Sequence, residues 1–301
     1  MNTSLERTRM QRAQPWLGTL VEIAAESTDS VRLNAAIERA FTRIAAIHAA
    51  MSFHNADSEL SRVNRHAARD WVALSGDLAR VFDAALEFAA ASDGLFDPSV
   101  APWLVESGHL PRHADLPAAA GPDWQSIEFD GDRVRFARPL LVDFGGIAKG
   151  YAVDAALAVL RGAGMDSARV NAGGDLARFG ESTEPVGVRH PAQPTLSLQL
   201  AELQNGAVAT TAGYYQTGAA ASPVRHPHTG AELCRTLSVS VLAPSCLAAD
   251  ALTKIVAADP LHARALLGRH GAQAVLIDPA RPDITLGDGT GWRNLPLEAH
   301  A

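Results

Sequence analysis

Apolar residues recur at helical spacing in five stretches of the chain. Between Leu33 and Met51 they fall three or four positions apart, which predicts a helix with one buried face. The stretch 77–91 shows the same spacing, and shorter helices are expected over 147–161, 247–258 and 261–269. These apolar faces are typical of a packed core and by themselves indicate no ligand.

Alternation of apolar and polar residues predicts strands between these helices. The stretch 17–25 alternates after a Gly18-Thr19 start, and 127–136 predicts a hairpin with its turn at Asp130-Gly131. Residues 108–125 have the composition of a long surface loop. Further strands are expected over 140–143, 169–172, 196–200, 208–211, 237–243 and 274–278.

Strands in hairpin-like succession with interspersed helices predict α+β architecture, a mostly antiparallel sheet with packed helices. No linker interrupts the sequence. We therefore expect a single domain over 1–301, divided at most into two sub-lobes near residue 180.

Composition and charge narrow the class of protein. Hydrophobic residues make up 47% of the chain and charged residues 20%, as in globular proteins, and the formal net charge of -7 without a basic block argues against nucleic acid as a partner. No apolar run approaches the roughly 18 residues of a transmembrane segment. The start lacks a secretory leader, so we expect a cytoplasmic protein as the sequence stands, or a periplasmic one if a leader has been removed. Cys234 and Cys246 are expected to be small buried groups.

Candidate chemistry concentrates first in the stretch VDFGGIAKGYAVDAAL, residues 142–157. A strand is expected to end at Asp143, and a helix to begin near Ile147 after two glycines. Unpaired amides at a helix start, with Lys149 in the first turn, favour an anion site. Ordinary turn chemistry is the alternative for this stretch alone.

Two later stretches carry candidate polar groups. RVNAGGDLARFG, residues 169–180, brings a strand to a Gly-Gly-Asp turn that is either a ligand approach or a plain bulge. In APSCLAADALTKIV, residues 243–256, Ser245 is a helix N-cap, and Asp250, Thr253 and Lys254 share one helical face. Asp250 and Thr253 offer the oxygen ligands that Mg²⁺ prefers, while an Asp250 to Lys254 surface ion pair is the alternative.

These three stretches, in this order, resemble the ApbE flavin transferase family, whose pattern includes DxGGIAKGYAxD, a strand ending in Gly-Gly, and a late ADA segment followed by threonine. Weaker matches extend along nearly the whole chain. They are LGT at 17–19, SFHNADSELSRVN at 52–64, DGLFDPSVAPW at 93–103, VGVRHP at 186–191 and VATTAGYYQ at 208–216.

The resemblance implies an enzyme that moves FMN from FAD to a threonine hydroxyl of an acceptor flavoprotein and releases AMP. FAD is then the substrate, with Mg²⁺ as the metal, in an ApbE-like fold. The residues that the resemblance implies for FAD binding are Leu17, Phe53, Leu95, Phe96, Asp97, Asp143, Lys149 and Arg225. For the metal they are the backbone oxygen of Gly146, with Asp250 and Thr253.

The sequence departs from the family pattern at the reacting centre. Many members have threonine four residues after the late aspartate, whereas this chain has Thr253 at three and Lys254 at four. Lys254 either displaces Mg²⁺ and neutralises the pyrophosphate itself, or points away. The family segment HxIDPxTG is here SPVRHPHTG, residues 222–230, so its histidine falls on Pro223.

Because this histidine is missing, more than one residue could be the base, and more than one function fits the sequence. Either His226, our first candidate, or His228 has become the general base, since histidine titrates near neutral pH, or an efficient base has been lost. Two other functions fit the same residues. They are a non-catalytic FAD-binding protein, and an FAD pyrophosphatase that yields FMN and AMP.

Overall fold

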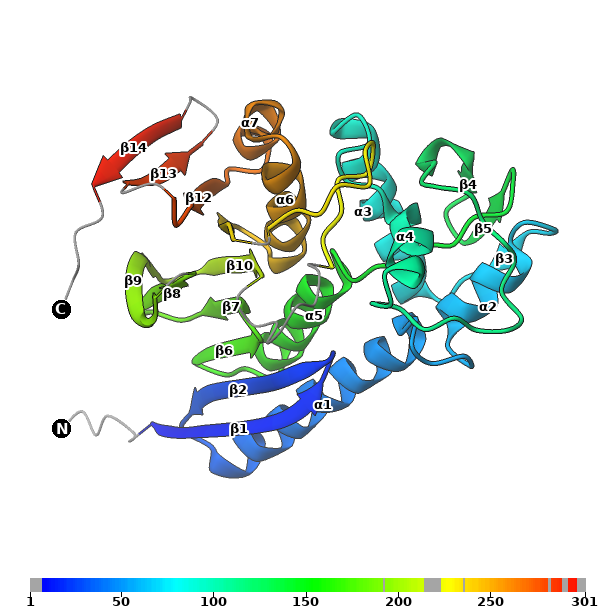
Figure 1. Cartoon of the computed structure of the whole chain (residues 1–301). Coiled ribbons are helices and arrows are strands. Elements are labelled where there is room, and N and C mark those ends of the chain that lie inside the picture. The colour runs from blue at the N-terminus through cyan, green and yellow to red at the C-terminus, as the bar shows by residue number, and fades with distance from the viewer. Residues whose placement is uncertain are drawn as a thin grey trace, which may run out of the picture.

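A large antiparallel sheet organises the molecule (Figure 1). The computed structural model describes residues 7–191, 193–213, 223–234, 236–280, 283–288 and 292–296. Within these ranges nine strands form the sheet, in the order β1-β2-β6-β7-β10-β11-β12-β13-β14. They are β1 (Thr8–Trp16), β2 (Thr19–Ser27), β6 (Ser167–Ala172), β7 (Asp175–Phe179), β10 (Gly206–Ala212), β11 (Ser238–Ala243), β12 (Gln273–Ile277), β13 (Asp283–Gly287) and β14 (Trp292–Pro296).

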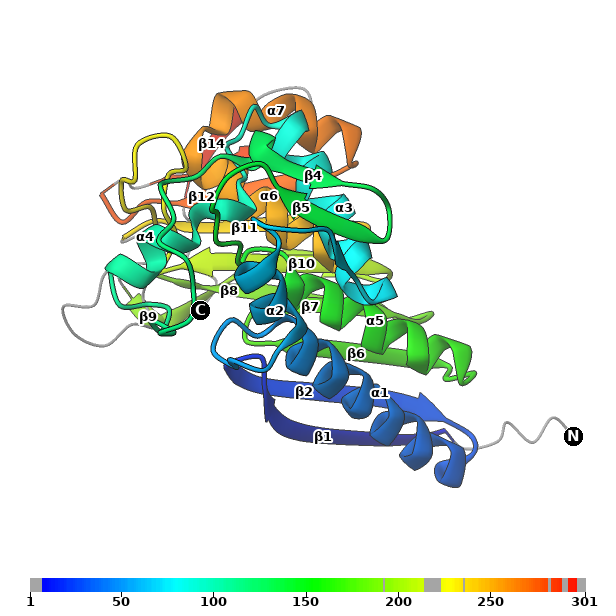
Figure 2. The same cartoon turned by 90° about the vertical axis from the view of Figure 1, so that its right-hand side faces the viewer.

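Helices cover one face of this sheet. Figure 2 shows α1, α5 and α6 lying across it in that order. The apolar stripe of each helix packs inward, as its spacing predicts; Leu33, Ile37 and Ile44 of α1 are fully buried. The helices of this layer are α1 (Ser30–Met51), α5 (Ala148–Gly162), α6 (Cys246–Ala258) and α7 (Pro260–Arg269).

A second group of helices and a small sheet lie beyond α1 and α5 in Figure 1, whereas the hairpin of β8 and β9 lies on the opposite side, beside β7 and β10. A three-stranded sheet has the order β3-β5-β4, and β8 pairs with β9 in a separate hairpin. The elements are α2 (Glu59–His66), β3 (Val72–Ala73), α3 (Gly76–Ala91), the 3-10 turn η1 (Pro98–Val100), α4 (Ala101–Glu106), the 3-10 turn η2 (Trp124–Ser126), β4 (Ile127–Phe129), β5 (Arg133–Phe136), β8 (Glu184–His190) and β9 (Gln193–Leu203). The prediction of α+β architecture is confirmed.

The strand predicted at 140–143 is wrong. The segment is buried but belongs to no sheet. The fully buried side chain of Asn64 takes the place of a neighbouring strand: its Oδ1 accepts from the Val142 amide at 2.8 Å and its Nδ2 donates to the Val142 carbonyl at 2.9 Å. The Asp143 amide donates to the Pro98 carbonyl at 2.8 Å. Asn64 therefore fixes the chain that leads into the glycine loop at 145–146.

The strand predicted from residue 17 begins two residues later. Trp16 pairs with Thr19, so Leu17 and Gly18 form a two-residue hairpin turn with φ of 56° and 73°. The preceding strand β1 escaped prediction because it is an exposed edge strand without apolar alternation.

The sheet passes through the boundary suggested near residue 180. β7 ends at Phe179, and it pairs both with β6 before that point and with β10 after it. We retain the prediction of one domain, because the same sheet contains strands from both sides. Among the helices in the described part of the chain, none has the length and apolar character needed to cross a membrane.

Both cysteines are expected to be unreactive in the native protein. Cys234 and Cys246 are buried and unpaired, and burial raises the pKa of Cys234 to about 11 and that of Cys246 well above the ordinary value. Since only the thiolate reacts, labelling by a disulfide reagent at pH 8 should be about a hundredfold slower than in urea. Rapid modification of one thiol in the native protein would contradict this burial.

Candidate functional site

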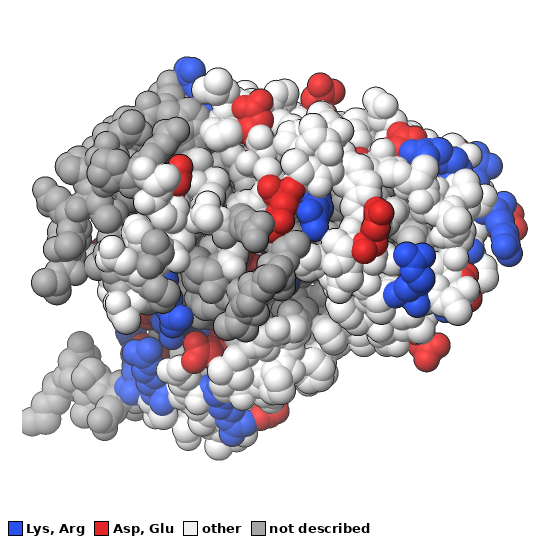
Figure 3. All heavy atoms as spheres, viewed as in Figure 1, with Lys and Arg blue, Asp and Glu red and all other residues white. Residues whose placement is uncertain are grey.

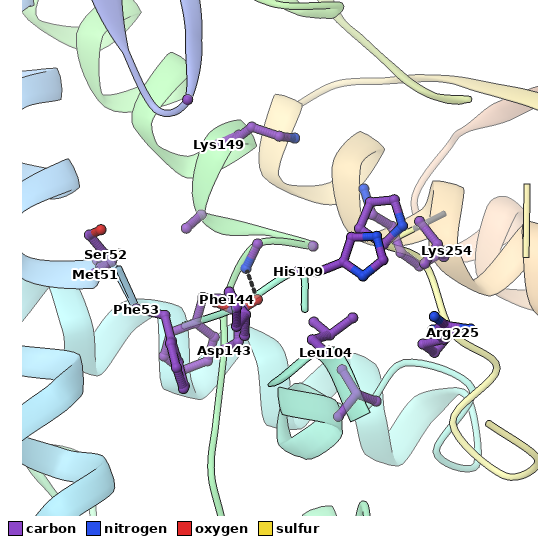
Figure 4. Close-up of a pocket in the computed structure, with 18 of the residues that line it drawn as sticks. Met51, Ser52, Phe53, Leu104, His109, Asp143, Phe144, Lys149, Arg225 and Lys254 are labelled. Carbon is purple, nitrogen blue, oxygen red and sulfur yellow. Dashed lines mark hydrogen bonds between the residues drawn. The ribbon is translucent and has the colours of Figure 1, made fainter. Parts of the chain in front are cut away.

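One cavity of about 690 Å³ opens among segments that are far apart in sequence. This volume lies within the roughly 300–1,000 Å³ common for small-molecule sites. Its walls come from the β1–β2 turn, the end of α1 with residues 52–54, the segment 95–110, the loop 143–146 with the start of α5, the loop 223–227, and α6. Figure 4 shows Phe53 on one side, and Lys254, His109 and Arg225 together on the other.

The cavity brings together every residue that the sequence predicted for FAD binding. Gly146 and Lys254 lie in the same wall. That the eight predicted side chains contact FAD stays a prediction, but their convergence from five segments is what a common ligand site requires. The eight residues are Leu17, Phe53, Leu95, Phe96, Asp97, Asp143, Lys149 and Arg225.

Two aspartates in the cavity wall, Asp97 and Asp143, have a pKa above the usual value because desolvation disfavours the charged carboxylate. Asp97 organises the wall: its carboxylate accepts from the Ser99 amide at 2.7 Å and the Trp124 amide at 3.2 Å. Asp143 accepts from the Gly145 amide at 2.9 Å, the dashed contact in Figure 4. A carboxylate with a raised pKa beside a ligand cavity is a candidate proton acceptor, so Asp143 joins the candidate bases.

The histidines predicted as bases hold the adjacent loop together. Nε2 of His228 donates to the Asp93 carbonyl at 3.0 Å, and Nδ1 of His226 accepts from the His228 amide at 3.2 Å. Neither is in the cavity wall, whereas His48, His54 and His109 are. The catalytic role of His226 and His228 stays a prediction.

Helices α5 and α6 cross at their first turns and cap one another. Asp154 of α5 accepts from the amides of Cys246 and Leu247 at 2.9 Å each. In return, Asp250 of α6 accepts from the Gly150 amide at 3.2 Å. Carboxylates at helix N-termini are stabilising because the amides there lack partners within the helix. The crossing explains the KGYAVD motif, since a Cβ at Gly150 would lie 2.3 Å from the Cys246 carbonyl oxygen.

Four charged side chains meet at this crossing. Asp250 lies between the two lysines: its Oδ1 accepts from Lys254 and its Oδ2 lies 3.5 Å from Nζ of Lys149. Lys149 also pairs with Asp175. Asp175 and Asp250 are buried, whereas 32% of the Lys149 side chain and 17% of that of Lys254 remain exposed. We call these four residues the lysine–aspartate cluster. The surface ion pair considered for Asp250 and Lys254 is thus an ion pair with a buried acid.

Electrostatics keep Lys149 and Asp250 charged. Burial would lower the pKa of Lys149, but the charges of Asp175 and Asp250 outweigh it and the pKa is raised. Asp250 would have its pKa raised by burial, yet Lys149 and Lys254 lower it. For Asp175, burial and the charge of Asp250 prevail and raise the pKa. Lys149 therefore stays protonated and Asp250 ionised at neutral pH.

Asp175 and Asp154 were not among the predicted site residues. Asp175 begins β7 after the Gly173-Gly174 turn, which has φ of 64° and 107°. The glycine turn is therefore a tight connection, and a Cβ at Gly173 would lie 2.4 Å from Oγ1 of Thr19. Its sequence signal was present as Gly-Gly-Asp, but the lysine contact depends on the tertiary fold. Residues 214–216 and 222 of the family motifs lie outside the described residues.

Thr253, predicted as a metal ligand, is fully buried behind the cavity. Its hydroxyl donates to the Asp250 carbonyl at 2.7 Å and meets Oγ1 of Thr211 at 2.7 Å. Among the residues that the structure describes, no group of three or more His, Cys, Asp or Glu side chains could hold a metal ion.

On the face drawn in Figure 3, acidic and basic side chains of the described residues are interspersed, and neither sign of charge dominates.

Comparisons with known proteins identify the family and agree with the fold. The sequence matches the profile of the ApbE family over residues 17–277. It is 29% identical over 244 residues to the FAD:protein FMN transferase of Vibrio cholerae, covering 74% of this chain and 72% of that protein. The structure is similar to an ApbE protein of Thermotoga maritima, with a TM-score of 0.77 at 25% identity, covering 89% of this chain and 94% of the other. The comparison with the flavin transferase ApbE of Vibrio cholerae gives a TM-score of 0.76 at 23% identity and covers 98% of this chain and 98% of the other. The two proteins therefore share the fold.

Proposed function

Because this chain belongs to the ApbE family, we infer that it is an FAD:protein FMN transferase. The observation that carries this inference is the cavity, which gathers all eight residues predicted for FAD binding. It ends at the lysine–aspartate cluster, where two ammonium groups reach the cavity wall. A dinucleotide with a central pyrophosphate is complementary to an apolar cavity with cations at one end.

The reaction exchanges one phosphorus–oxygen bond for another. The hydroxyl oxygen of an acceptor threonine bonds to the phosphorus of the FMN half, and the bond from that phosphorus to the bridging oxygen breaks. AMP leaves with the bridging oxygen, and the hydroxyl proton passes to a base. Catalysis of this kind depends mainly on positioning and on neutralising phosphate charge. Lys149, Lys254 and Arg225 are the basic side chains of the described cavity wall that can do so.

Mg²⁺ at Gly146, Asp250 and Thr253 is the arrangement that the family resemblance implies. The residues here do not fit it as they stand. One Asp250 oxygen is held by Lys254, and the other accepts from the Gly150 amide. The Thr253 hydroxyl already has two partners. Lys254, at the position where many family members have threonine, cannot replace that ligand, because a protonated lysine has no lone pair for a metal.

Transfer is tested by co-expressing the protein with a flavoprotein domain and measuring the mass of the product. The wild type should add one FMN to a threonine. Substitution of the base should slow transfer by roughly a hundredfold while FAD binding stays nearly intact. His226→Ala and His228→Ala test our first two candidates, and Asp143→Asn and His109→Ala test groups in the cavity wall.

The same assay separates the alternative functions. AMP release with free FMN and no modified protein would identify an FAD pyrophosphatase. FAD binding without any AMP release, in the presence of a domain that a related transferase modifies, would identify a binding protein. If neither His226→Ala nor His228→Ala slows transfer, the histidine assignment is wrong.

A further inference from the structure

We propose that Lys149 and Lys254, held side by side by Asp175 and Asp250, bind the pyrophosphate of FAD in place of a divalent cation. The proposal rests on the proposed function and assigns the source of positive charge in its site. It makes this transferase independent of added metal. Four observations support it. They are the ion pairs within the cluster, the partial exposure of its two lysines, the packing of the Lys254 stem, and the presence of only two lysines in the sequence.

Both ammonium groups have donors left for a ligand. An ammonium carries three N–H groups. Among the described residues, Lys149 contacts Asp175 and Asp250, while Lys254 contacts Asp250. The two acids are buried and the two lysines line the cavity, so the remaining N–H groups face the side from which FAD would enter. Buried acids behind partly exposed lysine side chains fix the cations before the ligand arrives, which is the preorganisation that phosphate chemistry needs.

Lys254 is fixed in this position by its stem as well as by its charge. A Cβ at Gly146 would lie 3.6 Å from Cε of Lys254 and 3.3 Å from Cε2 of Phe96. The glycine loop at the start of α5 therefore leaves room for the lysine stem against its backbone. Figure 4 shows Lys254 on the same side of the cavity as Arg225, whose Nε is buried without a hydrogen-bond partner in the described part of the chain. An unpaired buried donor beside the cluster is a further sign of an anionic ligand.

Lysine is confined to this site. The whole sequence contains 26 basic residues, of which only Lys149 and Lys254 are lysines. They are 105 positions apart in sequence, yet both contact Asp250. Arginine serves every other basic position, so the two lysines indicate a requirement for a compact point charge that a planar guanidinium does not meet.

A metal ion would have to displace Lys254 from Asp250. The ion would then lie within a few ångströms of two ammonium groups, and like charges at that separation repel one another. With both lysines in place, the acids are neutralised and a pyrophosphate meets only N–H donors. The two lysines of the cluster thereby supply the positive charge that a metal ion would supply, and the site needs no metal ligands.

The test measures FAD affinity by quenching of flavin fluorescence in EDTA and in Mg²⁺. Wild type should bind equally in both. Lys254→Met keeps the stem but loses the charge, and should weaken binding about 10- to 100-fold, as expected for lost charge-assisted hydrogen bonds. Lys254→Thr frees Asp250 and adds an oxygen ligand, so Mg²⁺ should restore part of its affinity. Arg9→Gln removes an exposed charge on β1 outside the cavity and should change nothing.

The measurement on wild-type protein can by itself contradict the proposal, so the test does not depend on whether a variant folds. A tenfold loss of FAD affinity on chelation, reversed by Mg²⁺, would show that a metal is required. Unchanged FAD binding in a folded Lys254→Met variant would remove Lys254 from the site. Failure of the proposed function gives a different result: no acceptor is modified, while FAD binding still depends on Lys254 and not on Mg²⁺.

Discussion

Lys149→Met is expected to destabilise the fold by about 3 kcal/mol and to reduce FAD binding by two orders of magnitude or more. Lys149 is the partner of buried Asp175 and the second cation beside buried Asp250. Removing one partner of a buried ion pair leaves an uncompensated charge, which costs about 3–5 kcal/mol, and we take the lower value because Lys149 is partly exposed. Urea unfolding measures the first effect and fluorescence titration the second.

A double substitution separates these two effects. Lys149→Met combined with Asp175→Asn removes both charges of the pair and should recover most of the lost stability. FAD binding should stay weak, because the cation is still absent. Full recovery of FAD affinity in the folded double variant would show that Lys149 only neutralises Asp175. Equal instability of the single and double variants would mean that the unpaired charge of Asp175 is not what destabilises the single variant.

Gly150→Ala should lower the free energy of unfolding by at least about 3 kcal/mol, in the upper range for single substitutions. The added methyl would lie 2.3 Å from the Cys246 carbonyl oxygen and 2.8 Å from the Leu247 amide. All these atoms belong to backbone at the start of α6, so no side chain can rotate away. The two helices must separate, and both reciprocal caps, from Asp154 and Asp250, would then lengthen.

The same helix offers a matched control. Gly162 is the last residue of α5, and a Cβ there would meet nothing within 4 Å. Gly162→Ala should therefore be neutral or stabilising by up to about 1 kcal/mol, because alanine favours the helix and loses less entropy on folding. Both variants are compared by their urea midpoints. Similar midpoints would mean that the α5–α6 crossing tolerates the methyl group.

Local periodicity predicted most regular elements because burial of one helix face or one strand face leaves a repeating pattern. Helix α1 and the hairpin of β4 and β5 follow their patterns closely. The exposed strand β1 leaves no such pattern, and 140–143 imitates a buried strand while its polar backbone is satisfied by Asn64 and Pro98. An asparagine 78 positions from Val142 cannot be connected to it by periodicity.

The same distinction between sequence and tertiary structure applies to the site. By itself the sequence determined the fold class, the family, and the residues that gather in the cavity, because these depend on local patterns and on ordered motifs. Only the tertiary structure decided how the charges are shared: Asp250 is occupied by both lysines, Asp175 joins them, and His226 and His228 lie outside the cavity wall. Motifs specify which groups are present. Whether a buried group can stay charged depends on the partners that the fold brings to it, because burying a charge without partners is costly.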